Sequence, residues 1–303
     1  MTRLIGLGSA VIDLVLTVPV MPVVGGDVLA TRSGWRAGGG ANVLVAATLA
    51  GLPSTYAGGH GTGPCGDLLR AALEAAGIAV LHGPDVDLDT GVCVVLVDGA
   101  GERTFVTTVG AEGHLRPQQW AGIECARGDY AYLSGYDLTY PHAADFLDWI
   151  STSSRFSGAL LVLDPGPLVG TLDVSVLDRV LSRYTWVSLS LDEAQTLTGR
   201  TDAASAGAAL LQRAPDADGV VVRTGSDGCV LAQRQQAGPL HIAGVPVSKV
   251  VDTNGAGDVH VGTFLAGLAR GLTARGAAAE ANAAAAAWVA DPAGHTGPAR
   301  GTA

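Results

Sequence analysis

The chain has 303 residues, of which 48% are hydrophobic and only 15% are charged, a composition that excludes intrinsic disorder and allows a substantial buried core. Its formal net charge of −10 excludes the basic surface that a nucleic acid or an anionic membrane requires, so we expect neither partner. This length fits one large α/β domain or two ordinary ones.

The four cysteines are widely spaced, form no Cys-x-x-Cys pair and show no metal-ligand spacing; they are Cys65, Cys93, Cys125 and Cys229. Scattered free thiols fit a reducing cytoplasm, where we expect the protein. The apolar stretch over residues 4–20 is interrupted by Gly6, Gly8 and Asp13, and it predicts a first strand rather than a signal peptide. The alanine-rich residues 283–290 belong to a helix too short to span a bilayer.

Beyond this strand, β-branched runs alternate with alanine- and leucine-rich stretches, a pattern typical of βαβ units that build a mainly parallel sheet. In chain order we expect helices over residues 66–76, 143–151, 191–198 and 203–213, and buried strands over residues 160–164, 185–189 and 220–222. A glycine-rich loop around residues 98–101 separates two strand-like arms, which predicts a β-hairpin over residues 93–108. Residues 27–36 also break the alternation, and residues 292–303 are expected to form a loose tail.

The most informative run is Asp252-Thr253-Asn254-Gly255-Ala256-Gly257-Asp258, which an apolar helix over residues 259–268 follows at once. Small residues let backbone N–H groups converge on one point, and the positive end of the helix dipole adds to them, so we expect an anion site. Asp258 at its mouth could take a proton from a substrate hydroxyl as that hydroxyl attacks a phosphoryl group. From spacing alone, an αβ loop with Asp258 as an N-cap is an equal alternative.

A second run is Gly38-Gly39-Gly40-Ala41-Asn42, followed by a helix of small residues over 43–51. Glycines let a ligand lie against the backbone, and an Asn amide offers a donor and an acceptor to neighbouring hydroxyls, chemistry that suits a polyol. The alternative is a tight turn with an N-capping Asn.

Together the two runs resemble the C-terminal and N-terminal signatures of the ribokinase-like (PfkB) family of sugar and nucleoside kinases. Further similar stretches extend the resemblance over about residues 4 to 296: they are residues 8–13, residues 90–104, Glu193 with Leu197-Thr198-Gly199, and residues 220–228. The resemblance implies a ribokinase-like three-layer α/β/α fold with a mainly parallel central sheet and a small β-sheet lid. It also implies a single kinase domain over residues 1–303, with lid strands from about 13–36 and 92–108 inserted in it.

The implied activity is the transfer of a phosphoryl group from ATP, with Mg²⁺, to a hydroxymethyl group of a small sugar. Asp258 would be the base, and the charge on the migrating phosphoryl group would be met by the amides of Gly255, Ala256 and Gly257. The substrate would bind at Asp13, Gly38, Gly39 and Asn42.

For the nucleotide, the resemblance implies contacts with Ser190, Thr224, Gly225, Ser226, Gly228 and Asn282. Glu193 would organise Mg²⁺ indirectly. Asp252 and the carbonyl of Asn254 resemble part of a monovalent-cation site that some members use, which makes K⁺ a second candidate ion. The family also implies a homodimer formed through the lid, where exposed strand edges need cover.

Three departures from the family pattern limit what can be carried over. Ser190 stands where the family's Asn-x-x-Glu motif has Asn, which puts that nucleotide contact in doubt, and Gly39 stands where ribokinases proper have lysine, which leaves ribose specificity open. His260 occupies a position where an aromatic residue is common, and we expect it to pack between helix and sheet. Asn282 could equally be a surface helix residue.

Other readings of the sequence remain. A nucleoside kinase would use the same catalytic residues with an aromatic slot for the base, for which Trp35, Tyr136 or Tyr140 are candidates. Residues 61–66 fit G-x-G-x-x-G, with acidic residues at 85 and 87, which makes an NAD-dependent oxidoreductase a more distant alternative.

A non-catalytic sugar- or nucleotide-binding relative is also conceivable, because Ser190 replaces the family Asn. A P-loop enzyme is excluded, since the chain has one lysine, Lys249, and no G-x-x-x-x-G-K-[ST] run. Phosphate must therefore be held by backbone amides and arginine, with Arg103 as a candidate.

Overall fold

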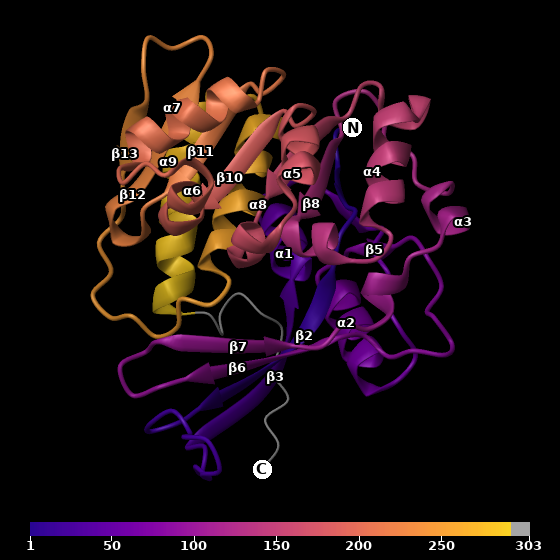
Figure 1. Cartoon of the computed structure of the whole chain (residues 1–303), viewed down its shortest axis with the longest axis vertical. Helices are drawn as coiled ribbons and strands as arrows, with labels where there is room; N and C mark the ends of the chain where they lie inside the picture. Colours follow the sequence, from indigo (N-terminus) through magenta and orange to yellow (C-terminus); the bar gives the residue numbers. More distant parts are fainter. Residues whose placement is uncertain (292–303) are drawn as a thin grey trace.

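The computed structural model describes residues 1–291, which form a large sheet covered by helices and a separate small sheet (Figure 1). The loose tail predicted over 292–303 lies outside the described residues. Nine strands in the order β13-β12-β11-β10-β9-β8-β1-β4-β5 make the large sheet. In chain order they are β1 (Leu4–Gly6), β4 (Ser54–Tyr56), β5 (Ala79–Val80), β8 (Tyr130–Ser134), β9 (Leu160–Asp164), β10 (Trp186–Ser190), β11 (Gly219–Arg223), β12 (Gly228–Gln233) and β13 (Leu240–Ala243).

The pairs between β5 and β11 in this order are parallel, and β12 and β13 add an antiparallel edge. Successive side chains of a strand enter two different cores: Trp186 packs in one apolar cluster and Val187 in the other. Because both faces are covered, the strands read as continuous apolar runs rather than alternating ones. The mainly parallel sheet expected from the βα alternation is confirmed.

Helices cover both faces of this sheet. One layer consists of α3 (Pro117–Trp120), α4 (Ala143–Thr152), α5 (Val174–Leu181), α6 (Leu191–Thr198) and α7 (Ala203–Arg213). The other consists of α1 (Gly40–Leu49), α2 (Pro64–Ala75), α8 (Ala256–Ala269) and α9 (Ala274–Ala290). Short 3₁₀ turns lie at Ala111–His114, Gly135–Thr139, Ser154–Phe156, Pro167–Thr171 and Gly225–Asp227. The three-layer α/β/α architecture that the resemblance implied is therefore present.

The small sheet lies apart from the large one, at the bottom of Figure 1, and we call it the lid. Its order is β3-β2-β6-β7, with bounds β2 (Ala10–Thr17), β3 (Arg32–Gly39), β6 (Val92–Val97) and β7 (Arg103–Thr107). Strands β6 and β7 are the hairpin predicted over 93–108, and they pair antiparallel. Asp13 lies opposite Arg36 in β3 and Cys93 in β6, so these three side chains share one face of the lid.

The prediction of one first strand was wrong in its extent. The chain leaves the large sheet after β1 and enters the lid as β2, so Asp13 lies inside a lid strand rather than at the end of a core strand. Gly8 sits at the crossover, where a Cβ would lie 1.9 Å from Asp137 Oδ2. Only a residue without a side chain lets the backbone pass this close to Asp137.

Candidate active site

The start of α8 is set by Gly255, whose backbone is left-handed (φ 83°) and suits glycine. The first helical hydrogen bond joins the Val259 N–H to the Gly255 carbonyl (2.9 Å), so the amides of the first turn have no partner inside the helix. One of them is already used, because the Ala256 N–H donates to the Thr253 carbonyl (3.2 Å). Of the three amides expected to meet an anion, those of Gly255 and Gly257 remain as the candidates.

Asp258 follows in the same helical turn and is held by a side chain from the distant helix α1. Asn42 Nδ2 donates to Asp258 Oδ2 (3.0 Å). Burial raises the pKa of Asp258 to about 7, with Asp164 and Asp13 adding to the rise, while the Asn42 hydrogen bond and the Arg223 charge oppose it. A carboxylate with a pKa near neutrality is suited to accept a proton in a reaction.

Asp13 reaches the same place from the lid. It is buried, with 6% of its surface exposed, and Asn254 Nδ2 donates to Asp13 Oδ2 (2.9 Å). Burial raises the pKa of Asp13 to about 6. Gly38 on the neighbouring strand makes room for it, because a Cβ at Gly38 would lie 2.3 Å from Asp13 Oδ1. The structure thus brings the expected substrate residues Asp13 and Gly38 into contact, and Asn254 ties them to the loop before α8.

Gly39 and Asn42 have distinct parts at the start of α1. Gly39 is the N-cap residue, with a left-handed backbone (φ 58°), and a Cβ there would lie 3.2 Å from the Ser9 carbonyl oxygen. The Asn42 side chain does not cap this helix, since its amide donates to Asp258. The alternative of a tight turn with an N-capping Asn is therefore wrong, and Asn42 belongs to the site around Asp258.

Three neighbouring parallel strands end at the same edge of the large sheet with polar residues: β9 with Asp164, β10 with Ser190 and β11 with Arg223. Arg223 Nη1 forms an ion pair with Asp164 Oδ2 (3.0 Å) and donates to Ser188 Oγ (2.7 Å). The pairing of Asp164 with Arg223 was not predicted from the sequence. The signal that could have revealed it is that each ends a buried strand, where α/β sheets bind their ligands.

Ser190 and Glu193 form a capping box at the start of α6. The Ser190 N–H donates to Glu193 Oε2 (2.8 Å), and the Glu193 N–H donates to Ser190 Oγ (3.3 Å). Burial raises the pKa of Glu193, and the nearby Asp164 charge adds to the rise. Ser190 therefore has a structural role in this capping box, and its expected contact with the nucleotide stays a prediction. The Glu193 carboxylate lies at the same edge of the sheet as Asp164, the last residue of β9.

The turn after β11 contains four of the expected nucleotide residues. The Thr224 N–H donates to the Gly228 carbonyl (2.8 Å), and Gly225 and Gly228 have positive φ angles of 65° and 96°. Ser226 lies in the 3₁₀ turn between them. The Thr224 hydroxyl is buried and has no hydrogen-bond partner among residues 1–291. The run is thus a tight connection between β11 and β12.

Asn282 is buried in α9, so the alternative of a surface helix residue was wrong. Its Nδ2 donates to the carbonyls of Ile242 (3.0 Å) and Ala243 (3.1 Å), and its Oδ1 lies 3.1 Å from His260 Nε2. Asn282 thereby fastens α9 to strand β13. His260 is buried between these elements, as its expected packing role requires, and burial lowers its pKa to about 3, with the Arg223 charge adding to the effect.

Asp252 holds the loop before α8 to two arginines of the lid. Its carboxylate forms ion pairs with Arg36 (2.9 Å) and Arg103 (2.7 Å) and accepts the Asn254 N–H (2.8 Å). Burial alone would raise the pKa of Asp252, but the amide and the guanidinium charges lower it below its ordinary value. The carbonyl of Asn254 accepts a hydrogen bond from Trp288 Nε1 (2.6 Å).

The partners of Asp252 and Asn254 decide whether K⁺ fits there, and Mg²⁺ is considered at Asp164 and Glu193. At the expected K⁺ position, the single carboxylate of Asp252 faces the two positive charges of Arg36 and Arg103, and the Asn254 carbonyl accepts the Trp288 indole N–H. A further cation beside two guanidinium groups is repelled, so these residues do not fit K⁺. Mg²⁺ fits better, because Asp164 and Glu193 offer hard carboxylate oxygens beside each other, and the one guanidinium of Arg223 balances only one of these two negative charges. Within residues 1–291, no group of three or more His, Cys, Asp or Glu is arranged as a metal site.

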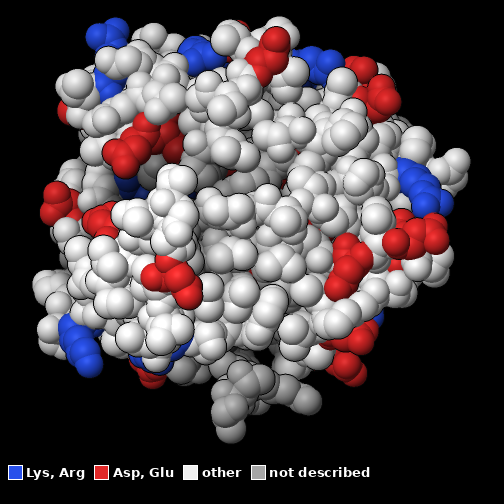
Figure 2. Space-filling model, turned by 60° about the horizontal axis from the view of Figure 1, so that its bottom comes forward, with Lys and Arg blue, Asp and Glu red and all other residues white. Residues whose placement is uncertain are grey.

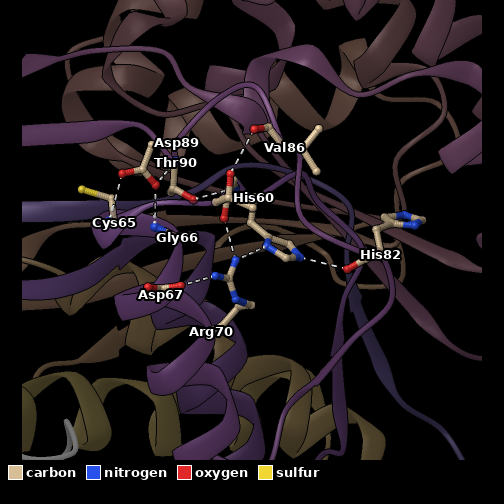
Figure 3. Close-up of polar contacts among 11 residues, drawn as sticks. His60, Cys65, Gly66, Asp67, Arg70, His82, Val86, Asp89 and Thr90 are labelled. Carbon is tan, nitrogen blue, oxygen red and sulfur yellow. Dashed lines mark hydrogen bonds and ion pairs between the residues drawn. The ribbon is translucent and has the colours of Figure 1, made fainter.

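The glycine turn over residues 61–66 does not have the features of a dinucleotide site. Figure 3 shows the Asp89 carboxylate at the start of α2, where it accepts the amides of Cys65 (3.0 Å), Gly66 (2.7 Å) and Thr90 (2.7 Å). A pyrophosphate would need the position that Asp89 fills. Asp85, a candidate for a ribose contact, accepts the backbone N–H groups of a local turn. The oxidoreductase alternative loses its structural basis.

On the face shown in Figure 2, lysine and arginine side chains are scattered along the rim and form no continuous basic area. No helix among residues 1–291 is long and apolar enough to cross a bilayer.

Comparison with known proteins places these features in one family. The model of the pfkB family carbohydrate kinases matches residues 1–298. An uncharacterised sugar kinase of Escherichia coli, YegV, is 31% identical over 293 residues, covering 96% of this chain and 88% of that protein. Adenosine kinase 1 of Arabidopsis thaliana is 28% identical over 72% of this chain and 67% of its own length.

Among solved structures, ribokinase from Giardia lamblia superposes with a TM-score of 0.83 at 21% identity, covering 96% of this chain and 94% of that one. At this identity the likeness shows the fold, and the family match and YegV carry the assignment. The chain belongs to the PfkB family of carbohydrate kinases and is a kinase.

Proposed function

We propose that this kinase transfers the γ-phosphoryl group of ATP to a hydroxymethyl group of a small sugar. The observation that carries the proposal is the position of Asp258, a carboxylate with a pKa near 7 in the first turn of α8, next to the amides of Gly255 and Gly257. A base for an alcohol and donors for a phosphoryl group are thus within a few residues of each other.

In the proposed reaction Asp258 accepts the hydroxyl proton, the hydroxyl oxygen forms a bond to the γ-phosphorus, and the bond from that phosphorus to the β-phosphate oxygen breaks to release ADP. The amides of Gly255 and Gly257 and the α8 dipole meet the charge that develops on the phosphoryl oxygens. Asp13 and Asn42 would orient the sugar hydroxyls. Mg²⁺ bound near Asp164 and Glu193 would neutralise part of the phosphate charge.

The nucleotide would lie along the edge formed by the ends of β10 and β11, at Ser190 and the turn Thr224, Gly225, Ser226 and Gly228. Asn282 is close to that edge, but its Nδ2 already donates to two carbonyls of β13. It would therefore contact the adenine by packing against it. We leave K⁺ out of the proposal, because the charges of Arg36 and Arg103 already neutralise Asp252.

A nucleoside kinase is the second candidate, since an adenosine kinase is among the relatives. Of the three aromatic residues considered for a base slot, Trp35 pairs with Leu14 and so lies on the lid face opposite Asp13, and Tyr140 is buried beside His142. Only Tyr136 is close enough to Asp13 for their charges to interact. A single aromatic side chain supports a sugar better than a stacked base.

The proposal is tested by incubating the protein with MgATP and a panel of hexoses, pentoses and nucleosides while ADP release is measured. Thermal-shift screening of the same compounds would rank ligands by binding. We expect turnover with a sugar that has a free hydroxymethyl group and none with its deoxy analogue at that carbon. Faster turnover with nucleosides would favour the second candidate. If neither a sugar nor a nucleoside supports ADP release, both candidates are refuted.

We also propose a homodimer formed through the lid. The lid face opposite Asp13 carries the row Trp35, Leu14, Val94 and Val106, and Trp35 and Val106 are 38% and 60% exposed. Apolar strand faces of this kind need cover. Light scattering should give twice the monomer mass, and Trp35→Glu should give the monomer; a monomeric wild-type protein would contradict the proposal.

Free thiols at the cysteines among residues 1–291 support a reducing compartment, and we propose the cytoplasm.

A further inference from the structure

Arg223 is the residue next to Ser190 at the edge of the large sheet. In the parallel pair β10 and β11, Ser190 lies opposite Arg223. Ser190 is the position where the family's Asn gives way to a shorter side chain, and its hydroxyl already accepts the Glu193 N–H. A donor lost at position 190 can therefore be replaced from the adjacent strand.

The short contacts of the Arg223 guanidinium are all made by one of its nitrogens, Nη1. Nη1 pairs with Asp164 (3.0 Å) and donates to Ser188 (2.7 Å), which fixes the orientation of the planar group. Nη2 lies 3.8 Å from Glu193 Oε2, beyond the length of a hydrogen bond. The side chain is 14% exposed, so little water competes for its remaining N–H groups.

The other side of the guanidinium faces the start of α8. A Cβ at Gly257 would lie 3.4 Å from both Nε and Nη2 of Arg223, so these nitrogens are next to the helix turn that contains the candidate amides. A side chain at position 257 would therefore be in contact with the guanidinium, and glycine leaves its Nε and Nη2 uncovered on this side.

We propose that Arg223 is a catalytic residue that donates hydrogen bonds from Nε and Nη2 to the γ-phosphoryl oxygens during transfer, in place of the amide donor that the family's Asn would supply at position 190. This inference rests on the proposed function. Arginine suits the role because its planar donors match phosphate geometry, and Asp164 supplies the orientation. With one lysine in the chain, an arginine is the cation available for this role at the edge of the sheet.

Arg223 also acts on the base. The Asp258 carboxylate is affected by Asp164 and Asp13, which raise its pKa, and by Arg223, which lowers it. Removing the guanidinium should therefore raise the pKa of Asp258 further, and the acid side of the rate profile should move to higher pH. A residue that only supports the fold from a distance would leave that profile in place.

The experiment compares Arg223→Gln with Arg223→Lys, with the double variant Arg223→Gln/Ser190→Asn, and with Arg234→Gln as a control. Arg234 bonds to main-chain carbonyls at Ala217 and Leu211 and takes no part in the site. We expect Arg223→Gln to lower kcat about 100- to 1,000-fold, as for the loss of one transition-state donor. Adding Ser190→Asn should recover at least about tenfold of the loss, and Arg234→Gln should keep kcat and the pH profile.

Nucleotide binding by calorimetry separates this inference from the proposed function, since it needs no acceptor. Arg223→Gln should weaken AMP-PNP, a non-hydrolysable ATP analogue, about tenfold or more with Mg²⁺ present and leave ADP within about twofold. Equal weakening of both nucleotides, or a kcat within about threefold of wild type, would overturn the role of Arg223. A wild-type protein that binds AMP-PNP in this Arg223-dependent way but phosphorylates no sugar would refute the proposed substrate and leave the role of Arg223 standing.

Discussion

Replacing Asp258 by asparagine should make the protein more stable and nearly inactive. The pKa of Asp258 is about 7 in the fold and 3.8 for a free side chain, a difference of about 3, and each unit is worth about 1.36 kcal/mol. Because the pKa is raised in the folded state, the unfolded chain releases this proton at lower pH. The contribution of Asp258 to stability is complete below pH 3.8 and is lost as the pH rises through 7.

At pH 8 Asp258 therefore costs the folded state about 4 kcal/mol as a buried carboxylate. At pH 5 it costs about 2 kcal/mol, because the folded protein must keep a proton that the unfolded chain has mostly released. Asp258→Asn removes this cost while the Asn42 amide keeps an oxygen to donate to. We expect the free energy of unfolding to rise by about 2–4 kcal/mol at pH 8 and by about half as much at pH 5. The same change removes the base, so kcat should fall about 10²- to 10⁴-fold while nucleotide binding stays close to normal.

Urea unfolding of the apoprotein at pH 5 and pH 8, together with ADP release, measures both effects. Asp87→Asn is the matched control, because Asp87 is an exposed aspartate outside the site, and it should change neither quantity. A variant that is less stable than wild type at pH 8 would refute the electrostatic reasoning. A kcat close to wild type would refute the catalytic role.

The acid side of the kcat/KM profile should have its midpoint near pH 7, because Asp258 must be ionised to accept a proton; a midpoint below pH 5 would contradict this. Gly38→Ala places a methyl carbon 2.3 Å from Asp13 Oδ1 and should raise the acceptor KM at least about tenfold, whereas Gly34→Ala, with nothing within 4 Å, should leave KM unchanged. Asp252→Asn leaves two lid arginines without their carboxylate and should lower the free energy of unfolding by about 1–3 kcal/mol in urea. Wild-type rates should be equal in K⁺ and tetramethylammonium, and activation by K⁺ would count against a site closed by the arginines.

The long periodic elements could be predicted well from the sequence. Helices α6 and α7 have the bounds expected for them, 191–198 and 203–213, and α2 begins two residues before the predicted residue 66 because Pro64 stands in its first turn. The boundary between β1 and β2 was missed, since both halves are apolar and the sheets they join differ only in tertiary pairing. Local pattern carries no information about which of two sheets a strand enters.

The helix start of the candidate site was predictable, because one short run contains it. The run that ends in Asp258 could be interpreted as a helix start with a base, because an N-terminal turn and its acid are neighbours in sequence. The partners of that run were not predictable, because they come from elements that are far away in the sequence. Asn42 meets Asp258 across 216 positions and Arg103 meets Asp252 across 149, and no local pattern encodes such a meeting.

These distant contacts also explain why Asp252, which was expected to bind K⁺, pairs with arginines instead. From the sequence alone, an aspartate before a glycine run could be neutralised either by a metal ion or by an arginine, because the carboxylate needs only a positive charge nearby. The fold decides between them by placing Arg36 and Arg103 on the lid opposite Asp252. The loop before α8 is thereby joined to the lid that carries Asp13, so one set of ion pairs positions both the proposed phosphoryl site and the proposed acceptor site.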